Sequence, residues 1–239
     1  MLGDNGLYYF TFLWLAVFSV FPLTVMAQDF ADDIQKMHAY YSTADTLDLD
    51  ISMEVFRSGQ DKDPYLTYKA SVYKSGKNYY YRLEDMQLIM TEKALITIYN
   101  RQKQMVYRPV DIDSWQQTAR GMYAGALDSL LQQTDSVTFV GRKNENNIYY
   151  IYTNSLISKT ELQLDPESGR IRYLAYYYNT SLPSGVYMVK TFFDEKSGMA
   201  SNMSRALFDE WSYIVFSEGK IRPAASYITY DLSIIPNDN

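Results

Sequence analysis

Hydrophobic and polar residues alternate along most of the chain. In residues 47–55 the odd positions are apolar, while the even positions hold Asp48, Asp50, Ser52 and Glu54. A period of two places these two sets on opposite faces of a β-strand. Because short polar turns separate the segments that follow, we expect antiparallel pairing between neighbours in sequence. Further strands are predicted at 66–72, 79–83, 87–90, 95–99, 104–108, 137–142, 148–153, 159–164, 171–178, 187–193, 211–216 and 227–234.

Two segments have helical periodicity instead. Residues 29–41 place Phe30, Ile34, Met37 and Tyr41 on one stripe, which predicts a short amphipathic helix. Residues 114–133 begin with a capping box and carry Trp115 and Met122 on their apolar stripe. This second helix is expected to be marginal, since its two internal glycines each cost about 1 kcal/mol relative to alanine. About ten strands and two helices in one domain indicate one highly curved sheet or an open barrel.

The N-terminal 27 residues have a different character. Residues 7–27 contain no charge and end in Val25-Met26-Ala27, a pattern typical of a secretory signal peptide. We therefore expect a signal peptide at 1–27, a single mature domain at 28–239, and export to a bacterial periplasm. A retained N-terminal membrane anchor is the alternative, because about 20 apolar residues can span a bilayer. The absence of cysteine fits a periplasmic protein without disulfides.

Composition narrows the possible functions. The chain has no Cys and one His, which excludes thiolate catalysis and a His-rich metal centre. Its net charge of −6 argues against nucleic-acid binding, which requires basic residues to displace counterions. The 24 tyrosines favour half-buried strand surfaces over a helical bundle.

Catalytic motifs are weak in this sequence. Asp111 and Asp113 start like a calcium loop, but the glycine and glutamate of that loop are missing, so helix N-terminal charge is the better interpretation. Asp48 and Asp50 share a strand face and allow carboxylate chemistry, but a solvated strand face explains them better, because acids that alternate with apolar residues are typical of an exposed face. His38 lies beside an apolar helical stripe without a nucleophile motif. We therefore expect a non-enzymatic protein that needs no cofactor or metal.

Several segments resemble the periplasmic lipoprotein carriers LolA and LolB. The resemblance lies in Tyr-Lys-Ser-Gly-Lys at 73–77, in the strand–turn–strand at 87–99, and in the later hairpins at 162–171 and 187–194. It covers residues 29–195 and implies a half-open antiparallel β-barrel with a helical lid over an apolar cavity that receives acyl chains. The family's usual Lys-Arg-Pro appears here as Lys74-Ser75-Gly76, so the arginine used for lid control is not matched. The usual Asp-Gly turn appears as Glu92-Lys93.

The expected fold is therefore mainly β with a few helices (α+β), a half-open antiparallel β-barrel of about ten strands with a helical lid. The expected function is to hold a lipid or lipoprotein acyl chain as a monomeric carrier in outer-membrane lipid trafficking, with inner- or outer-membrane proteins as further partners. A partly empty apolar interior would gain about 0.8 kcal/mol per buried methylene. For each candidate residue the alternative is ordinary core packing. The candidate cavity and lid residues are Leu49, Ile51, Met53, Ala70, Val72, Tyr81, Leu83, Leu88, Ile96, Ile98, Trp115 and Met122.

A second interpretation of the same fold remains open. An envelope sensor or protein-interaction module would bind a partner through a sheet edge or through residues 197–224. Filling the cavity would leave the activity of such a module unchanged.

Overall fold

One large, mainly antiparallel sheet dominates the structure. The computed structural model describes residues 21–110, 132–179, 185–196 and 206–236. Twelve strands form this sheet in the order β14-β6-β5-β4-β3-β2-β1-β11-β10-β9-β8-β7, and β12 pairs with β13 in a separate hairpin. The strands are β1 (Thr46–Phe56), β2 (Leu66–Ser75), β3 (Asn78–Leu83), β4 (Met86–Met90), β5 (Ala94–Tyr99), β6 (Gln104–Pro109), β7 (Thr134–Lys143), β8 (Asn146–Thr153), β9 (Ile157–Leu164), β10 (Ile171–Tyr178), β11 (Met188–Glu195), β12 (Ile214–Ser217), β13 (Lys220–Pro223) and β14 (Asp231–Ile234).

The sheet is not closed into a barrel. Strands β14 and β7 lie at the two ends of the strand order and do not pair with each other. The prediction of a mainly β fold is confirmed. The prediction of a barrel of about ten strands is not confirmed, because the sheet has twelve strands and is open. The sheet is longer than expected partly because β14 joins it by pairing in parallel with β6, residue Asp231 opposite Gln104. A parallel pair between segments so far apart in sequence leaves no turn signal from which to predict it.

A long helix covers part of one sheet face. Helix α2 (Phe21–Thr43) contains the predicted segment 29–41 and extends beyond it at both ends. Its stripe packs against strands β8–β10, as the helical spacing predicted. The cluster contains Phe30, Ile34, Met37 and Tyr41 from α2 with Tyr149, Ile151, Leu162, Leu164 and Leu174 from the sheet. We call the side of the sheet against which α2 packs the helix face.

The last turn of α2 reaches β1 and β2. Tyr40 and Tyr41 pack against Leu47, Leu49 and Val72. The Tyr40 hydroxyl donates a hydrogen bond to Glu195 Oε1 at 2.5 Å, and the Tyr41 hydroxyl accepts one from the backbone N–H of Ile171. Burial, reinforced by the Glu195 carboxylate, raises the pKa of Tyr40 to about 12. Both rings therefore stay neutral donors or acceptors that fasten the helix end to the sheet.

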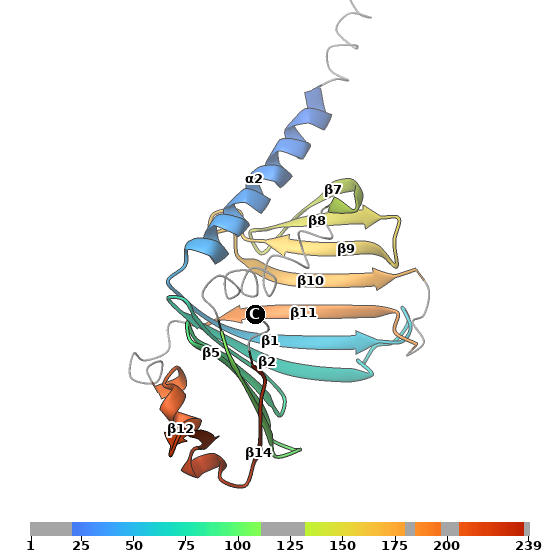
Figure 1. The fold of residues 1–239 in the computed structure, drawn as a ribbon. Coiled ribbons are helices and arrows are strands. Elements are labelled where there is room, and N and C mark those ends of the chain that lie inside the picture. Colours follow the sequence, from blue (N-terminus) through green and yellow to red (C-terminus); the bar gives the residue numbers. More distant parts are fainter. Residues whose placement is uncertain (1–20, 111–131, 180–184, 197–205, 237–239) are drawn as a thin grey trace, which may run out of the picture.

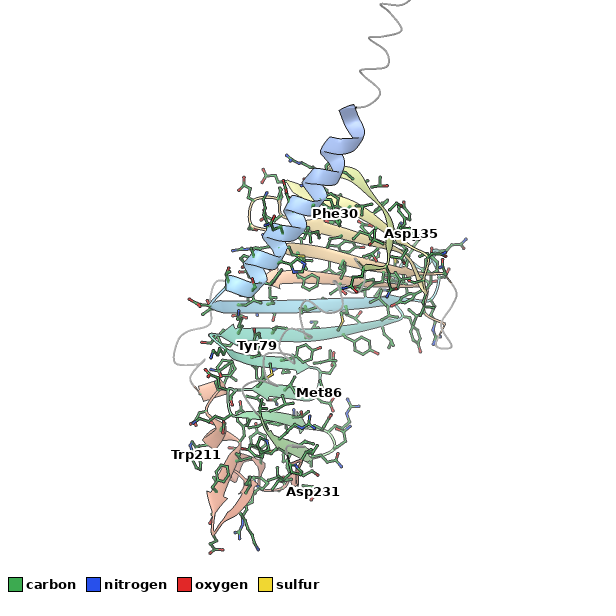
Figure 2. All side chains as sticks on the ribbon, turned by 45° about the horizontal axis from the view of Figure 1, so that its top comes forward. Phe30, Tyr79, Met86, Asp135, Trp211 and Asp231 are labelled. Atoms are coloured by element: carbon green, nitrogen blue, oxygen red, sulfur yellow. The ribbon has the colours of Figure 1, made fainter. Side chains whose placement is uncertain are left out.

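The other sheet face is covered at the opposite end by residues 206–236, which we call the C-terminal segment. Ile214 and Tyr213 are buried there against Ile89, Ile96, Ile98, Met105 and Tyr107 of β4–β6. We call this side of the sheet the C-terminal face. Figure 1 shows α2 and the C-terminal elements at opposite ends of the sheet, and Figure 2 places Phe30 and Trp211 there.

The two late strands were predicted too long. Residues Glu210–Ser212 form a 3₁₀ turn, η1, because Asp209 Oδ1 accepts a hydrogen bond from the backbone N–H of Trp211. A second 3₁₀ turn, η2 (Ala225–Tyr227), precedes β14. Strand structure in this region is therefore confined to β12, β13 and β14.

Two predictions fall at least partly outside the described residues. The helix expected at 114–133 lies almost entirely outside them, and so does most of the signal peptide at 1–27. Whether cleavage occurs, or an anchor is retained, stays a prediction. Within the described ranges, no helix is both long and apolar enough to cross a membrane.

Candidate functional site

The helix face brings eight of the predicted cavity residues together. Residues paired across neighbouring strands project to the same face. One row crosses the sheet through Leu49, Val72, Tyr81 and Leu88, and the next row contains Ile51, Ala70 and Leu83, with Met53 beyond Ile51. Together, these two rows of paired residues form a continuous apolar strip on the helix face, from β1 to β4.

Exposure changes along this strip. Leu49, Ala70 and Val72 are buried, whereas Tyr81, Leu83 and Leu88 are only half-buried. Leu49 and Val72 lie beneath the last turn of α2, where Tyr40 and Tyr41 pack, and Ile51 and Tyr81 pack against the same cluster. The half-buried Leu83 and Leu88 lie farther along the sheet, on β3 and β4. Figure 2 shows this region between its labelled residues Tyr79 and Met86.

Ile96 and Ile98 lie on the opposite face from the other candidates. Ile96 pairs with Ile89 and Ile98 pairs with Gln87, so both alternate with the residues of the helix-face rows. Both are fully buried against the C-terminal segment, in the cluster around Tyr213 and Ile214. They do not share a surface with Leu49 or Leu88. Trp115 and Met122, the predicted lid residues, lie outside the described residues.

The sequence itself indicates that β5 is covered on both faces, unlike β1. Residues 94–99 read Ala-Leu-Ile-Thr-Ile-Tyr, an almost continuous apolar run, while 47–55 alternate strictly with polar residues. Continuous apolar strands are typical of sheets covered on both faces. In β5 the burial alternates between buried and half-buried positions, which shows that the C-terminal segment occupies the better covered side.

Lys74 is a basic residue within the apolar pattern of the helix face. It lies two positions after Val72 on β2 and pairs with Leu47 and Tyr79. Its exposed fraction is 6%, the lowest of the lysines whose burial is described. Its Nζ lies 5.8 Å from the centre of the Tyr79 ring. Burial lowers the pKa of Lys74, opposed by the negative charge of Asp45.

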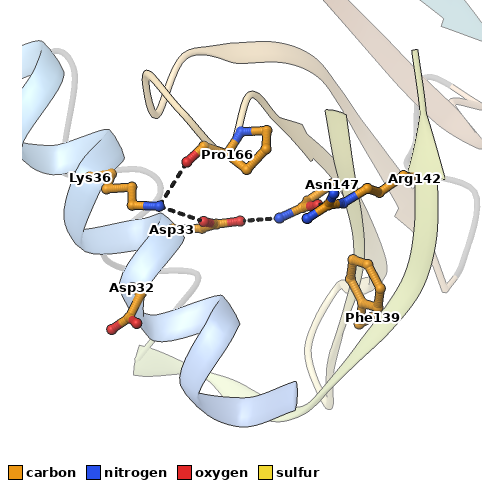
Figure 3. A pocket seen from close by; sticks show the side chains of 7 residues that line it. All are labelled: Asp32, Asp33, Lys36, Phe139, Arg142, Asn147 and Pro166. Carbon is orange, nitrogen blue, oxygen red and sulfur yellow. Dashed lines mark hydrogen bonds and ion pairs between the residues drawn. The ribbon is translucent and has the colours of Figure 1, made fainter. Parts of the chain in front are cut away.

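A second candidate site is a pocket of about 410 Å³ beside α2. Its centre is the buried carboxylate of Asp33, whose Oδ2 accepts hydrogen bonds from Asn147 Nδ2 at 2.6 Å and from the Tyr149 hydroxyl at 2.7 Å. Figure 3 shows the Lys36 ammonium between Asp33 Oδ1 at 3.6 Å and the Pro166 carbonyl at 2.7 Å. The lining residues are Asp32, Asp33, Lys36, Phe139, Arg142, Asn147 and Pro166.

The polar groups of this pocket bind one another. Arg142 Nε donates to Asn147 Oδ1 at 2.9 Å, which completes a chain from β7 through β8 to α2. Buried polar groups are stable only when paired in this way. The network therefore fastens α2 to β8, and its charges are balanced by two acids and two bases among the lining residues.

Aromatic side chains gather on the C-terminal face of β8–β11, beyond the reach of the C-terminal segment. Lys159 Nζ lies 4.4 Å from the centre of the Tyr150 ring and 3.9 Å from that of Tyr177. Tyr173 and Phe192 are in ring contact beside them. Burial, together with the nearby Glu161 carboxylate, raises the pKa of Tyr177 to about 12. These rings remain neutral and offer a partly exposed amphipathic surface.

The weak catalytic candidates are separated by the sheet. Asp48 and Asp50 alternate with Leu47, Leu49 and Ile51, so they lie on the face opposite α2, which carries His38. Asp50 binds Lys196 Nζ at 2.5 Å and accepts a hydrogen bond from the Ser71 hydroxyl at 3.0 Å. The Lys196 bond is the main reason that the pKa of Asp50 is lowered.

Metal-ligating groups do not gather either. In the part of the chain that the structure describes, no three His, Asp or Glu side chains converge on a metal-sized site.

Comparison with known proteins gives matches in structure but none in sequence. No protein-family model and no curated protein matches the chain. Solved structures that are similar include an uncharacterized conserved protein from Thermus thermophilus, at 13% identity and a TM-score of 0.40, over 75% of this chain and 93% of that one. A LolA superfamily protein from Nitrosomonas europaea matches at 10% identity and a TM-score of 0.33, over 78% and 99%. A domain from Vibrio parahaemolyticus, named for outer-membrane lipoprotein sorting, matches at 8% identity and a TM-score of 0.31, over 74% and 96%.

Proposed function

We propose that this protein is a non-enzymatic periplasmic carrier that holds the alkyl chain of a lipid or lipoprotein against the helix face of its sheet. The observation that carries the proposal is the strip of apolar residues on this face, of which Leu49, Ala70 and Val72 are buried and the rest are half-buried. The half-buried members are Ile51 and Met53 on β1, Tyr81 and Leu83 on β3, and Leu88 on β4. The resemblance of residues 29–195 to LolA and LolB carriers points to the same function.

Binding would be driven by exclusion of water. Each methylene buried against such a strip contributes about 0.8 kcal/mol, so ten methylenes contribute about 8 kcal/mol before the entropy of ordering the chain is subtracted. The residues proposed to contact the chain are Leu49, Ile51, Met53, Ala70, Val72, Tyr81, Leu83 and Leu88. The predicted lid residues Trp115 and Met122 would close over it.

Two neighbouring residues on β4 test the proposal. Leu88 is a member of the apolar strip, while Gln87 lies beside it on the opposite face and is also half-buried. We expect Leu88→Trp to weaken the binding of a fluorescent fatty acid at least tenfold, because the larger ring fills space that the alkyl chain would use. Gln87→Trp should change this affinity less than twofold, and fluorescence titration of the two folded variants measures the difference.

A direct test examines the protein's own cargo. Protein purified from its native compartment should release lipid on solvent extraction, identified by mass spectrometry. If the protein is reproducibly empty and also fails to bind fluorescent fatty acids, the carrier proposal is wrong.

One observation favours an interaction module instead. Apolar side chains are exposed in the C-terminal segment, with Trp211 at 59%, Phe216 at 49% and Ile228 at 77%. Trp211 and Phe216 are in edge-to-face contact. Exposed aromatic pairs of this kind are common at protein interfaces. For such a module, Leu88→Trp would leave activity intact while replacing Trp211 and Phe216 by serine would abolish it.

A further inference from the structure

Lys74 is buried among apolar side chains on the helix face. Its cross-strand neighbours are Leu47 on β1 and Tyr79 on β3, and Tyr79 in turn pairs with Met90 on β4. Leu47 is 3% exposed and Met90 is 1% exposed. Val72, two residues earlier on the same strand, is 3% exposed. The lysine therefore shares its row with apolar residues and adjoins the strip proposed to hold an alkyl chain.

Lys74 differs from Lys77 and Lys196 both in its burial and in its charge partners. Lys77 pairs with Glu92 at 3.5 Å and Lys196 with Asp50 at 2.5 Å, and both of these lysines are about half exposed. Among the described residues, the contact of Lys74 is with the Tyr79 ring, and no carboxylate lies within ion-pair distance of it. Asp45, which follows α2, acts on it only at longer range.

Most of the Lys74 side chain is buried, and burial disfavours the charged form of its ammonium group. The cation–π contact with the Tyr79 ring offsets only part of this cost. A ligand with an anionic group would supply the missing charge. The same ligand would need an apolar part to lie against Val72, Tyr81 and Leu88.

We propose that Lys74 is the headgroup site of this protein and that the ligand is an anionic amphiphile, with a carboxylate or phosphate on the lysine and its alkyl chain along the apolar strip. This inference rests on the proposed carrier function and names its ligand class. The proposal predicts that the protein binds an anionic amphiphile more tightly than an uncharged lipid of equal chain length.

Three probes with the same dodecyl chain separate charge from chain: dodecanoate, dodecyl phosphate and dodecanol. The wild-type protein should bind at least one of the two anions about tenfold or more tighter than the alcohol, measured by calorimetry at pH 7.5 with delipidated protein. Tighter binding of the carboxylate alone assigns a fatty acid, and tighter binding of the phosphate alone assigns a phospholipid headgroup. Tighter binding of both anions shows that the protein recognises the negative charge that the two headgroups share.

Substitution of the lysine tests its role. Lys74→Met should remove the preference for the anion by weakening anion binding about tenfold, while dodecanol affinity changes less than twofold. Lys77→Met, in the exposed hairpin beside it, is the matched control and should keep the preference, as should Lys74→Arg. Because Lys74→Met also removes a charge from a largely buried side chain that has no ion-pair partner among the described residues, it should raise the urea midpoint of the ligand-free protein, a result that a merely structural lysine would not give.

The outcomes separate the two proposals. Equal binding of anions and alcohol by the wild type, or an anion preference that survives Lys74→Met, would overturn the headgroup assignment and leave the carrier proposal standing. Failure of all three probes to bind would overturn both.

Discussion

The two ends of the sheet are covered on opposite faces. Over β8–β10, α2 packs on the helix face and leaves the aromatic rows of the other face partly exposed. Over β4–β6, the C-terminal segment packs on the other face, and the helix-face residues Leu88, Leu95 and Val106 are half-buried. The same sheet thus has two cores on different sides. Among the described residues, the less buried apolar surface of each region is therefore mostly on the face against which its cover does not pack.

Which side of a strand becomes core depends on the second layer, not on the strand alone. Tyr149 and Ile151 on β8 are fully buried because α2 lies above them. Ile96 and Ile98 on β5 are fully buried because Tyr213 and Ile214 pack on them on the C-terminal face. If the two covers act independently, damage to one core should not alter the other.

The largest expected effect comes from emptying both cores. Leu162 in the α2 cluster and Ile214 in the C-terminal cluster are both fully buried. Each change to alanine should lower the free energy of unfolding by about 2–5 kcal/mol, from lost apolar contact and the cavity left behind. The double variant should lose the sum within about 0.5 kcal/mol, as measured by urea denaturation.

The exposed Leu156 provides the control for these two variants, since it is 51% exposed. Leu156→Ala should change stability by less than about 0.5 kcal/mol. A coupling energy above about 1 kcal/mol between Leu162→Ala and Ile214→Ala would show that the two covers are not independent.

A smaller effect is expected from the network that fastens α2. Asp33→Ala would remove the buried carboxylate that accepts hydrogen bonds from the Asn147 amide and the Tyr149 hydroxyl, at a cost of about 3 kcal/mol. Asp32→Ala, one residue away and exposed, should cost less than about 0.5 kcal/mol. Chemical denaturation of both variants measures the difference, and hydrogen exchange should show faster exchange in α2 for Asp33→Ala alone. Equal stability of the two variants would contradict the fastening role.

The smallest expected effect is the difference in stability between alanine substitutions at two glycines. Gly76 and Gly169 both adopt positive φ, +58° and +75°, but only Gly169 lies against α2. A Cβ on Gly169 would lie 2.5 Å from the carbonyl carbon of Lys36, whereas one on Gly76 would meet nothing within 4 Å.

Gly76→Ala should therefore cost about 1 kcal/mol for its backbone conformation alone. Gly169→Ala should cost about 1 kcal/mol or more beyond that, because α2 must shift. Thermal unfolding of the two variants gives the comparison, and identical melting temperatures would mean that α2 yields without cost at this contact.

Local patterns were sufficient for most elements of the fold. The period of two in β1 and the turn at 165–169 follow from backbone geometry and neighbouring residues. The stripe of Phe30, Ile34, Met37 and Tyr41 likewise predicted which side of α2 would pack. Such features depend on interactions within a few residues, so the sequence alone determines them. Eight of the candidate residues share a face for the same reason.

Contacts between distant segments decided the rest. The pairing of β14 with β6 and the seating of Tyr213 and Ile214 on β4–β6 join residues more than 100 positions apart. These contacts bury Ile96 and Ile98, whose face is set by the pairing of β5 with the neighbouring β4. Within the described ranges, the distance of Lys74 from carboxylates likewise follows from which side chains surround it in space. The alternation of a strand specifies two faces, but only the layers that pack on them decide which becomes core and which stays open to a ligand.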